Sequence, residues 1–424
     1  MPHTLTVRLN DRHVGTITNL ATDHNVFTFD PSYLTDPTAP ILSLGLFNAD
    51  RKLVNPSKTP QVRLLPFFAN LLPEGHLREY LAARAGVNPL RDFPLLWLTG
   101  HDLPGAVIIE HPEGAHVPAD DDNVVLPEAQ ADPSILKFSL AGVQLKFSAI
   151  RQADGGLTIP LHGVGGDWIL KMPSATFRLV PENEFAMLTF AREVGIEVSE
   201  MFLGDPSAVG NLPKEVRGDL GRGLFIRRFD RDGRRRIHME DFNQIFAQYP
   251  ADKYKNVSYA NMLAGIWSLM GEEGAREFVR RLVFNIGIGN GDMHLKNWSL
   301  IYRDGITPEL SPAYDYVATR AYIGADKLAL TIARSREWSE MTYDRFERFA
   351  RRAEVPSGLV VNAAREIVDR MQTVWPTLKP NLELPPDLLA QIDSHMASVP
   401  LFGASPAVPA GLPDDAKPEQ PEIA

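Results

Sequence analysis

The chain contains no cysteine in its 424 residues. Disulfides, thiolate metal sites and a cysteine nucleophile are therefore excluded. No run of apolar residues approaches the roughly 18 to 20 that a membrane-spanning helix needs. The N-terminus, MPHTLTVRLN, also lacks the basic start and apolar run of a signal peptide. We therefore expect a cytoplasmic protein without a membrane partner.

An excess of basic residues is absent as well. Lysine and arginine number 43 against 53 aspartates and glutamates, which gives a formal net charge of -10. This balance disfavours broad, non-specific binding to nucleic acid, although it does not exclude a local basic patch. With 44% hydrophobic and 23% charged residues, the composition is that of a globular protein with a substantial core. The length predicts about two or three domains.

Hydrophobic periodicity predicts a β-rich first half and a helical second half. Alternating apolar residues are typical of half-buried strands, and apolar residues three and four positions apart are typical of amphipathic helices. The Asp232-Gly233 pair predicts a β-hairpin. We expect strands at residues 5–9, 13–17, 25–29 and 167–172 and on both sides of that pair. We expect helices within residues 67–86 and at residues 182–195, 258–286, 342–354, 357–374 and 386–398.

Changes in composition divide the chain into four parts. Residues 1–125 form a first region that ends in a polar, acidic stretch. Residues 126–240 are β-rich, and residues 241–402 are mainly helical. Residues 403–424 are rich in proline, alanine and acidic residues, which predicts a disordered tail.

The sharpest chemical motif is GNGDMHLKNWSL, which is followed by SPAYDYV. Phosphoryl transfer needs an acidic residue near the attacking hydroxyl and oxygen ligands that hold magnesium against the phosphates. Asp292 and Asn297 have the D-x-x-x-x-N spacing of protein-kinase catalytic loops. Asp315 follows at a distance that suits a second magnesium ligand, although its neighbours do not form D-F-G. The pattern therefore predicts a phosphotransfer site.

Other interpretations of this motif stay open at the level of single residues. Asp292 alone could cap a turn, with His294 and Lys296 facing solvent. His294 could bind a metal, but no second histidine stands at ligand spacing. The spacing of several motif residues together favours phosphotransfer over both readings.

Three further segments have weaker signals. Lys171 in WILKMP lies in an apolar strand, where it either contacts ATP phosphates with help from Glu182 or Glu184 or reaches water at the strand end. The small residues of FSLAGVQLKFS could cradle phosphates or form a plain β-turn. An arginine run could contact phosphate or nucleic acid, or form a solvated hairpin face. It consists of Arg222, Arg227, Arg228, Arg231, Arg234, Arg235 and Arg236.

Taken together, the segments resemble the HipA family of bacterial serine/threonine kinases, the toxins of toxin–antitoxin pairs. The resemblance spans about residues 5–400. It rests on FFANLLPEGHLRE, LPGAV, SLAGVQLKFS, WILKMP, ENEFAML, IRRFDR, HMEDF, GNGDMHLKN and PAYDYV, in the family's order. It implies an α+β, two-lobed, protein-kinase-like fold. The N-terminal lobe is β-rich and has an extra N-terminal subdomain, and the C-terminal lobe is mainly helical.

The resemblance also implies roles for individual residues. Asp292 would be the catalytic base, Asn297 and Asp315 the magnesium ligands, and Ser139 a site of inactivating autophosphorylation. The hinge, Arg227 to Phe229, departs from the family's common Glu-Arg-Phe, and Leu145 replaces a commonly polar residue. The ATP-binding residues would be Ala141, Gly142, Val143, Gln144, Leu145, Lys146, Lys171, Arg227, Arg228, Phe229, His294, Leu295, Lys296, Asn297, Tyr314 and Asp315.

The expected function is that of a serine/threonine protein kinase toxin that uses ATP and Mg²⁺ and is self-inhibited by autophosphorylation. The resemblance implies an aminoacyl-tRNA synthetase as substrate and a HipB-like helix-turn-helix antitoxin as partner, which would mediate contact with operator DNA. Two alternatives stay open. One is a small-molecule phosphotransferase of the aminoglycoside type, and the other is a non-catalytic partner in DNA corepression.

Overall fold

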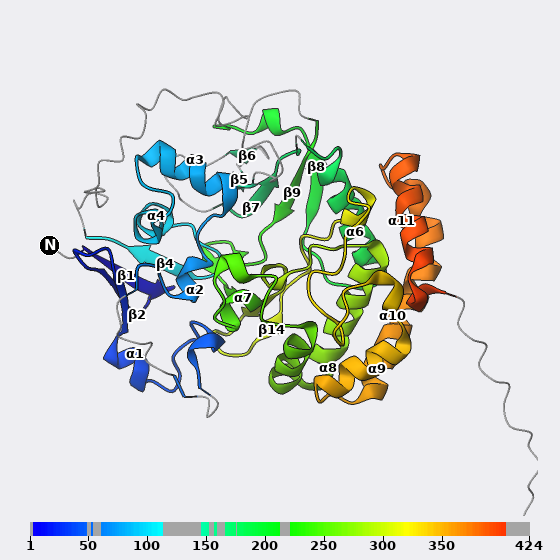
Figure 1. Ribbon diagram of the computed structural model, residues 1–424. Coiled ribbons are helices and arrows are strands. Elements are labelled where there is room, and N and C mark those ends of the chain that lie inside the picture. The colour runs from blue at the N-terminus through cyan, green and yellow to red at the C-terminus, as the bar shows by residue number, and fades with distance from the viewer. Residues whose placement is uncertain are drawn as a thin grey trace, which may run out of the picture.

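The computed structural model describes residues 3–48, 52–53, 61–112, 146–151, 157–158, 166–174, 176–212 and 221–403. Its β-rich half and its helical half lie side by side, which confirms the predicted α+β, two-lobed arrangement (Figure 1). The predicted tail beyond residue 403 lies outside the described residues. Within the described ranges, no helix is long and apolar enough to cross a membrane.

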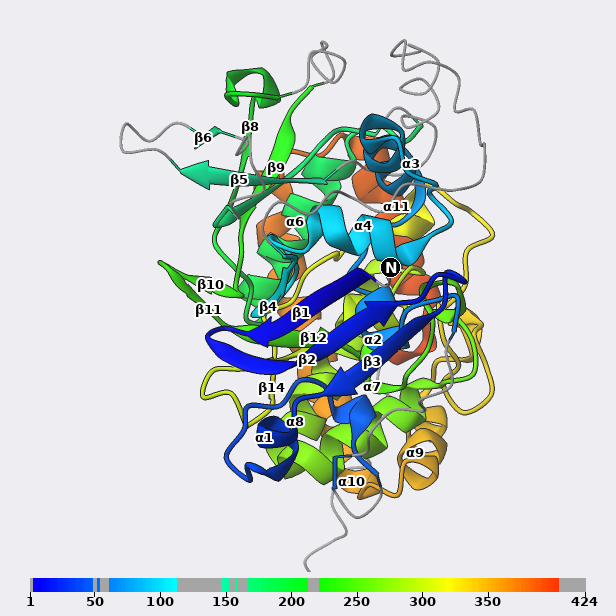
Figure 2. The same cartoon turned by 90° about the vertical axis from the view of Figure 1, so that its left-hand side faces the viewer.

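The N-terminal region is built on a four-stranded antiparallel sheet with the order β3-β2-β1-β4. Buried residues alternate along β1, so one face of the sheet packs on a core with the helices that follow. Figure 2 shows β1, β2 and β3 side by side with α2 and α4 nearby. The elements are β1 (His3–Leu9), β2 (Arg12–Asn19), β3 (Asn25–Phe29), α1 (Pro31–Thr35), α2 (Pro66–Ala69), α3 (Gly75–Ala85), α4 (Asp92–Thr99) and β4 (Val107–Glu110).

A five-stranded antiparallel sheet with the order β6-β5-β7-β9-β8 follows. Leu224 and Ile226 of β9 belong to the large core that α6 shares, whereas Phe225 between them belongs to a small cluster on the other face. This alternation follows from the two-residue period of a strand. The elements are β5 (Lys146–Arg151), β6 (Leu157–Thr158), β7 (Trp168–Lys171), α6 (Val180–Glu193), β8 (Met201–Gly204) and β9 (Gly223–Arg227).

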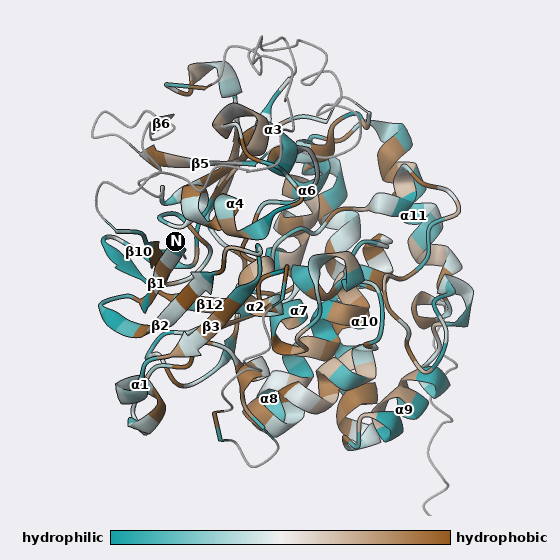
Figure 3. Cartoon of the chain, turned by 60° about the vertical axis from the view of Figure 1, so that its left-hand side comes forward, coloured by the Kyte–Doolittle hydropathy of each residue, from teal (hydrophilic) through white to brown (hydrophobic). Residues whose placement is uncertain are grey.

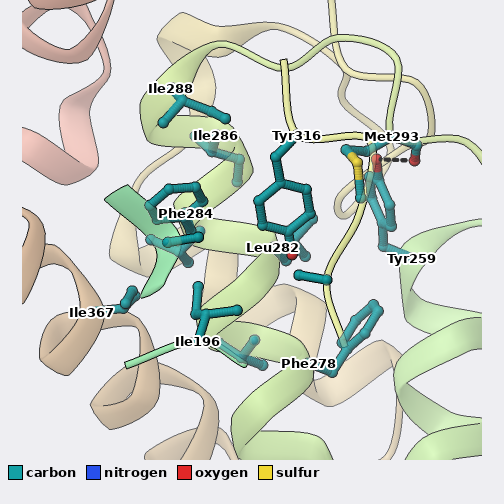
Figure 4. Packing of buried hydrophobic residues seen from close by; sticks show 14 of the residues in the cluster. Ile196, Tyr259, Phe278, Leu282, Phe284, Ile286, Ile288, Met293, Tyr316 and Ile367 are labelled. Atoms are coloured by element: carbon teal, nitrogen blue, oxygen red, sulfur yellow. Dashed lines mark hydrogen bonds between the residues drawn. The ribbon is translucent and has the colours of Figure 1, made fainter. Parts of the chain in front are cut away.

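The helical lobe is organised around the long helix α8. A capping box between Ser258 and Asn261 begins α8, and Gly289, with φ of +71°, ends it. Figure 4 shows Phe284 of α8 between Tyr316 and Ile367 in the core of this lobe. The elements are α7 (Phe242–Ile245), α8 (Tyr259–Ile288), α9 (Tyr343–Arg352), α10 (Ser357–Leu378) and α11 (Pro386–Ser398).

The helices expected from periodicity are confirmed to within a few residues. Gly195, with φ of +82°, stands just after α6 as expected for a C-terminal cap. Brown and teal segments alternate along α8 and α10 in Figure 3, as amphipathic helices require. α8 also contains a break at Gly271, whose φ of +63° and ψ of -147° are not helical.

The predicted hairpin is shorter than expected. The turn at Gly233 is present, but it joins only β10 (Arg231–Asp232) and β11 (Arg235–Arg236). The preceding strand β9 pairs with β7 and β8, whereas the following strand β12 (His238–Asp241) pairs with β13 (Ser299–Tyr302). β13 also pairs with β14 (Glu309–Leu310). The flanking strands therefore find long-range partners that a local turn signal cannot reveal.

The interpretation of the arginine run as a solvated hairpin face is wrong for two of its arginines. Arg228 and Arg231 are 8% and 9% exposed. Both bind the buried carboxylate of Asp230, with nitrogen–oxygen distances of 2.8 to 2.9 Å. Asp102 of the N-terminal region accepts a bond of 2.9 Å from Arg228, and the backbone N–H of Gly105 donates to Asp230 at 2.8 Å. This ion network joins the N-terminal region to the end of the central sheet.

We expect replacement of Asp230 with alanine to lower the free energy of unfolding by about 3 to 5 kcal/mol, because two buried guanidinium groups lose their shared anion. The midpoint of urea unfolding measures this change. Asp232→Ala, at an exposed position of the same hairpin, is the matched control and should leave the free energy of unfolding within about 0.5 kcal/mol of the parent. Equal midpoints for both variants would contradict a stabilising role of the network.

Candidate active site

An ion cluster with a buried lysine at its centre lies where the central sheet meets the helical lobe. The ammonium group of Lys171, at the end of β7, contacts the carboxylates of Glu184 on α6 and of Asp315 beyond β14. The Nζ atom of Lys146 lies 3.2 Å from Oδ2 of Asp315. Of the two carboxylates proposed to support Lys171, the structure selects Glu184. Glu182 instead lies 3.4 Å from Arg222.

Burial and charge compete within this cluster. Burial disfavours the charged form of Lys171, but the carboxylates of Asp315 and Glu184 outweigh it and raise the pKa of Lys171. Burial likewise opposes ionisation of Asp315, but Lys146 and Lys171 hold its pKa well below the usual range. Lys171 and Asp315 are therefore both charged at neutral pH.

The backbone of Asp315 has an unusual conformation that its neighbours hold in place. Its φ of +57° lies in the left-handed region, which side chains disfavour. Its N–H donates to Oε1 of Glu184 at 3.2 Å, and its carbonyl accepts from Nδ2 of Asn290 at 3.1 Å. Strain of this kind persists where surrounding contacts determine it, which is common at functional sites.

Asn290 joins the segment of Asp315 to the predicted catalytic loop. Its side chain is 1% exposed, and its Nδ2 also donates to Oδ1 of Asn285 in α8. Its Oδ1 accepts from the backbone N–H of Asp292 at 3.1 Å. One amide therefore connects the two loop segments to α8. Tyr259, at the start of α8, donates to the carbonyl of Met293 at 2.8 Å and anchors the same loop (Figure 4).

The carboxylate of Asp292 accepts a hydrogen bond from the hydroxyl of Tyr254. Burial raises the pKa of Asp292, although the Tyr254 hydroxyl and Lys253 act in the opposite direction. Tyr254 is 42% exposed, and Asp292 is itself an exposed residue of the loop. Sequence patterns contained no sign of Tyr254, because it belongs to a loop before α8.

Asn297 is oriented by the same loop. Its Nδ2 donates to the carbonyl of Asp292 at 2.8 Å, and within the described residues its Oδ1 has no hydrogen-bond donor. This oxygen and the Asp315 carboxylate are the hard oxygen ligands that Mg²⁺ prefers. Across the described parts of the chain, no three histidine or acidic side chains form a dedicated metal cage. The oxygens of Asn297 and Asp315 fit Mg²⁺, which commonly takes one or two protein oxygens together with substrate phosphates.

His294 and Leu295 are buried beside these residues. Burial lowers the pKa of His294 to about 3, so its imidazole is neutral, and its ring meets the Tyr254 ring edge-on at 5.0 Å. The Leu295 side chain is fully buried in the hydrophobic core, which leaves only its backbone for a ligand.

Lys296 connects the loop to the N-terminal region. Its Nζ lies 2.5 Å from Oε1 of Glu74 and donates to the carbonyl of Asn70 at 3.1 Å. Lys253, next to Tyr254, lies 3.2 Å from the other oxygen of Glu74. The LPEG segment that contains Glu74 was a family signature in the sequence, but its contact with the loop was not predicted.

The segment predicted as the hinge, Arg227 to Phe229, begins at the last residue of β9. The backbone N–H groups of Arg227 and Arg228 donate to the backbone carbonyls of Glu200 and Asp167, each at 2.8 Å. The Phe229 ring lies 5.8 Å from the ring of Tyr314, which donates to the carbonyl of Lys296 at 2.9 Å. Ser139, Ala141, Gly142, Val143, Gln144 and Leu145 lie outside the described residues.

Comparison with known proteins supplies independent evidence. The HipA N-terminal domain matches residues 5–110, and the HipA-like C-terminal domain matches residues 138–375. "Putative kinase Y4dM" of Sinorhizobium fredii is 45% identical over 401 residues, which cover 94% of this chain and 97% of that protein. The serine/threonine-protein kinase toxin HipA of Shewanella oneidensis is 24% identical over 369 residues, 75% of this chain and 76% of that protein.

A solved structure of Shewanella oneidensis HipA, in complex with HipB and operator DNA, has the same fold. It superposes with a TM-score of 0.71 at 20% sequence identity and covers 94% of this chain and 96% of that one. The likeness in fold extends over the N-terminal region and both sides of the ion cluster. With both of its domains matched, the chain belongs to the HipA family of kinase-like proteins.

Proposed function

We propose that this chain is a serine/threonine protein kinase that transfers the γ-phosphoryl group of ATP to a serine hydroxyl of a protein. The observation that carries the proposal is the contact of Lys171 with both Glu184 and Asp315. Asn290 connects the backbone of Asp315 to that of Asp292. A lysine supported by a helix carboxylate, an aspartate and a D-x-x-x-x-N loop are the parts that kinases use.

Each part has a role in the proposed reaction. Lys171 holds the ATP phosphates, and Asp292 accepts the proton of the serine hydroxyl as its oxygen bonds to phosphorus. The bond between the γ-phosphorus and the bridging oxygen breaks, and ADP leaves. Asn297 and Asp315 would hold Mg²⁺, which neutralises phosphate charge when bound. The raised pKa of Asp292 makes it a stronger proton acceptor than an aspartate with the ordinary pKa.

We further propose that the chain is the toxin of a toxin–antitoxin pair. Its relative from Shewanella oneidensis is named a toxin, and the solved complex of a HipA contains HipB and operator DNA. A helix-turn-helix antitoxin is therefore the proposed partner, and the proposed protein substrate is an aminoacyl-tRNA synthetase. Ser139 is proposed as the point of self-inhibition.

The test combines purified protein with controlled expression. With MgATP, the chain should incorporate phosphate at Ser139, located by mass spectrometry, and Asp292→Ala should not. On expression, the parent should arrest growth and phosphorylate a translation protein, and Asp292→Ala should do neither. Equal growth arrest by both chains would contradict a catalytic mechanism. Turnover of an aminoglycoside without labelling of protein would favour a small-molecule phosphotransferase.

A further prediction concerns Glu74. We expect Glu74→Gln to lower kcat about tenfold while the KM for ATP changes little, because Lys296 and Lys253 lose the anion that ties the loop to the N-terminal region. Steady-state kinetics with a peptide substrate measures kcat and the KM for ATP separately. Glu193→Gln, at an exposed position of α6, removes the same charge and should leave both constants unchanged. A raised KM with unchanged kcat would exclude the positioning role.

A further inference from the structure

An arginine-rich pocket of about 580 Å³ lies on the helical lobe, between the turn at residues 332–335 and helix α9. Its lining shares no residue with the proposed active site. Figures 1 and 2 place α9 at the end of the molecule away from β5. The lining residues, called here the arginine pocket, are Ala333, Arg334, Glu340, Arg345, Arg348, Arg351 and Arg352.

One arginine of the pocket has a structural role. Arg345 contacts the carboxylate of Glu340 and donates from Nε to the carbonyl of Glu340 at 2.8 Å. Its NH1 group donates to the carbonyl of Ala333 at 2.9 Å. Arg345 therefore neutralises the one acidic residue of the lining and attaches the turn to α9.

The other four arginines are exposed. Arg351 has a distant partner on its own helix, Glu347, at 3.7 Å. Within the described parts of the chain, Arg334, Arg348 and Arg352 have no anionic partner. Arginines in the last turn of a helix suit the helix dipole, which accounts for Arg351 and Arg352. It does not account for Arg348 or for Arg334, which faces them from the turn.

The turn itself is strained in a way that positions Arg334. Ile332 and Ser335 exchange backbone hydrogen bonds of 2.8 and 3.0 Å around Ala333 and Arg334, whose φ values are +46° and +71°. Such two-residue turns normally contain asparagine and glycine, which tolerate positive φ. Here two residues with side chains adopt it, and Arg345 holds the turn in place. Arg334 therefore lines the pocket from the turn, whereas Arg348, Arg351 and Arg352 line it from α9.

The chemistry of these groups identifies the class of ligand. Guanidinium groups bind phosphate oxygens through paired, charge-assisted hydrogen bonds. The chain as a whole carries a net charge of -10, so a pocket with three arginines that lack an anionic partner within the described residues is a local exception. A volume of this size is typical of small-ligand sites. Cations that line one pocket from two separate elements suit a compact anion better than the convex backbone of a duplex.

We propose that the arginine pocket binds a small oligophosphate, that is, two or three linked phosphate groups, either free or attached to a nucleoside. The site is separate from the proposed ATP site and does not depend on kinase activity. Sodium tripolyphosphate is the probe for the free form, and ATP is the probe for the nucleotide form.

Hydrogen exchange of the full chain, followed by mass spectrometry, locates binding without reference to the ATP site. We expect tripolyphosphate, ATP or both to slow exchange of amides in residues 332–336 and 345–352. Protection by tripolyphosphate shows that the phosphate chain is sufficient for binding. Protection by ATP alone shows that the pocket also contacts the nucleoside. No protection of these residues by either probe would overturn the proposal.

Two double variants distinguish binding in the arginine pocket from a non-specific effect of positive charge. In the double variant Arg348→Gln and Arg352→Gln, the probe concentration that gives half-maximal protection should rise on the order of a hundredfold. The control pairs Arg192→Gln with Arg234→Gln, two exposed arginines elsewhere, and should retain the protection. Equal weakening in both double variants would show a non-specific charge effect and reject the site. Protection by a 20-base-pair duplex but not by tripolyphosphate would reject the small-ligand assignment.

Discussion

Replacing Asp292 with asparagine is expected to lower the rate of phosphoryl transfer on the order of a thousandfold, within the range that a positioned general base contributes. Asparagine has the same shape and can still accept the Tyr254 hydroxyl, so the loop should keep its conformation. What is lost is the negative charge that accepts the serine proton. The measurement is the single-turnover rate with saturating MgATP.

Two controls distinguish loss of the base from loss of structure. Affinity for ATP should stay within a few-fold of the parent, because Asp292 is assigned to the hydroxyl side of the reaction. Tyr254→Phe removes only the hydrogen bond to the carboxylate and should retain the rate to within a few-fold. A comparable fall for Tyr254→Phe would assign the effect to loop structure instead of to the base.

Replacing Lys171 with methionine is expected to have two large effects. Phosphoryl transfer should fall on the order of a hundredfold or more, because the cation on the ATP phosphates is gone. The protein should also lose about 3 to 5 kcal/mol of stability, since Glu184 is 1% exposed and loses its partner. Activity and urea unfolding are measured on the same preparation.

A second substitution separates the two effects of Lys171→Met. Adding Glu184→Gln removes the unpaired buried carboxylate and should recover most of the stability. It should not recover activity, because the phosphate-binding cation is still missing. Recovery of activity together with stability would show that Lys171 acts only through folding and would remove it from the proposed mechanism.

Much of the fold was predictable from local patterns. Helices α6, α9, α10 and α11 lie close to their expected ranges because each has an amphipathic period and a recognisable end, such as Gly195 after α6. The hairpin at Gly233 was predicted only in its turn. β9 and β12 diverge because their partners, β7 and β13, come from distant parts of the sequence.

The choice between Glu182 and Glu184 shows why local sequence patterns do not predict which residues meet in a site. Both open the same helix, so the sequence favours neither. Residues two positions apart point to different sides of a helix. Only the packing of α6 against the central sheet turns Glu184 towards Lys171 and leaves Glu182 beside Arg222.

By itself, the sequence determined the chemical groups and their family: the Asp292 and Asn297 spacing, Asp315, and a lysine in an apolar strand. Only the tertiary structure decided how these groups are held. Tyr254 and Glu74 contact the loop from two separate segments, and no short-range pattern encodes such contacts. Asn290, within the loop, also bonds to Asn285 and to the backbone of Asp315. The NGDMHLKN loop thus contains the groups of the proposed reaction, whereas its geometry depends on the packing of distant segments around it.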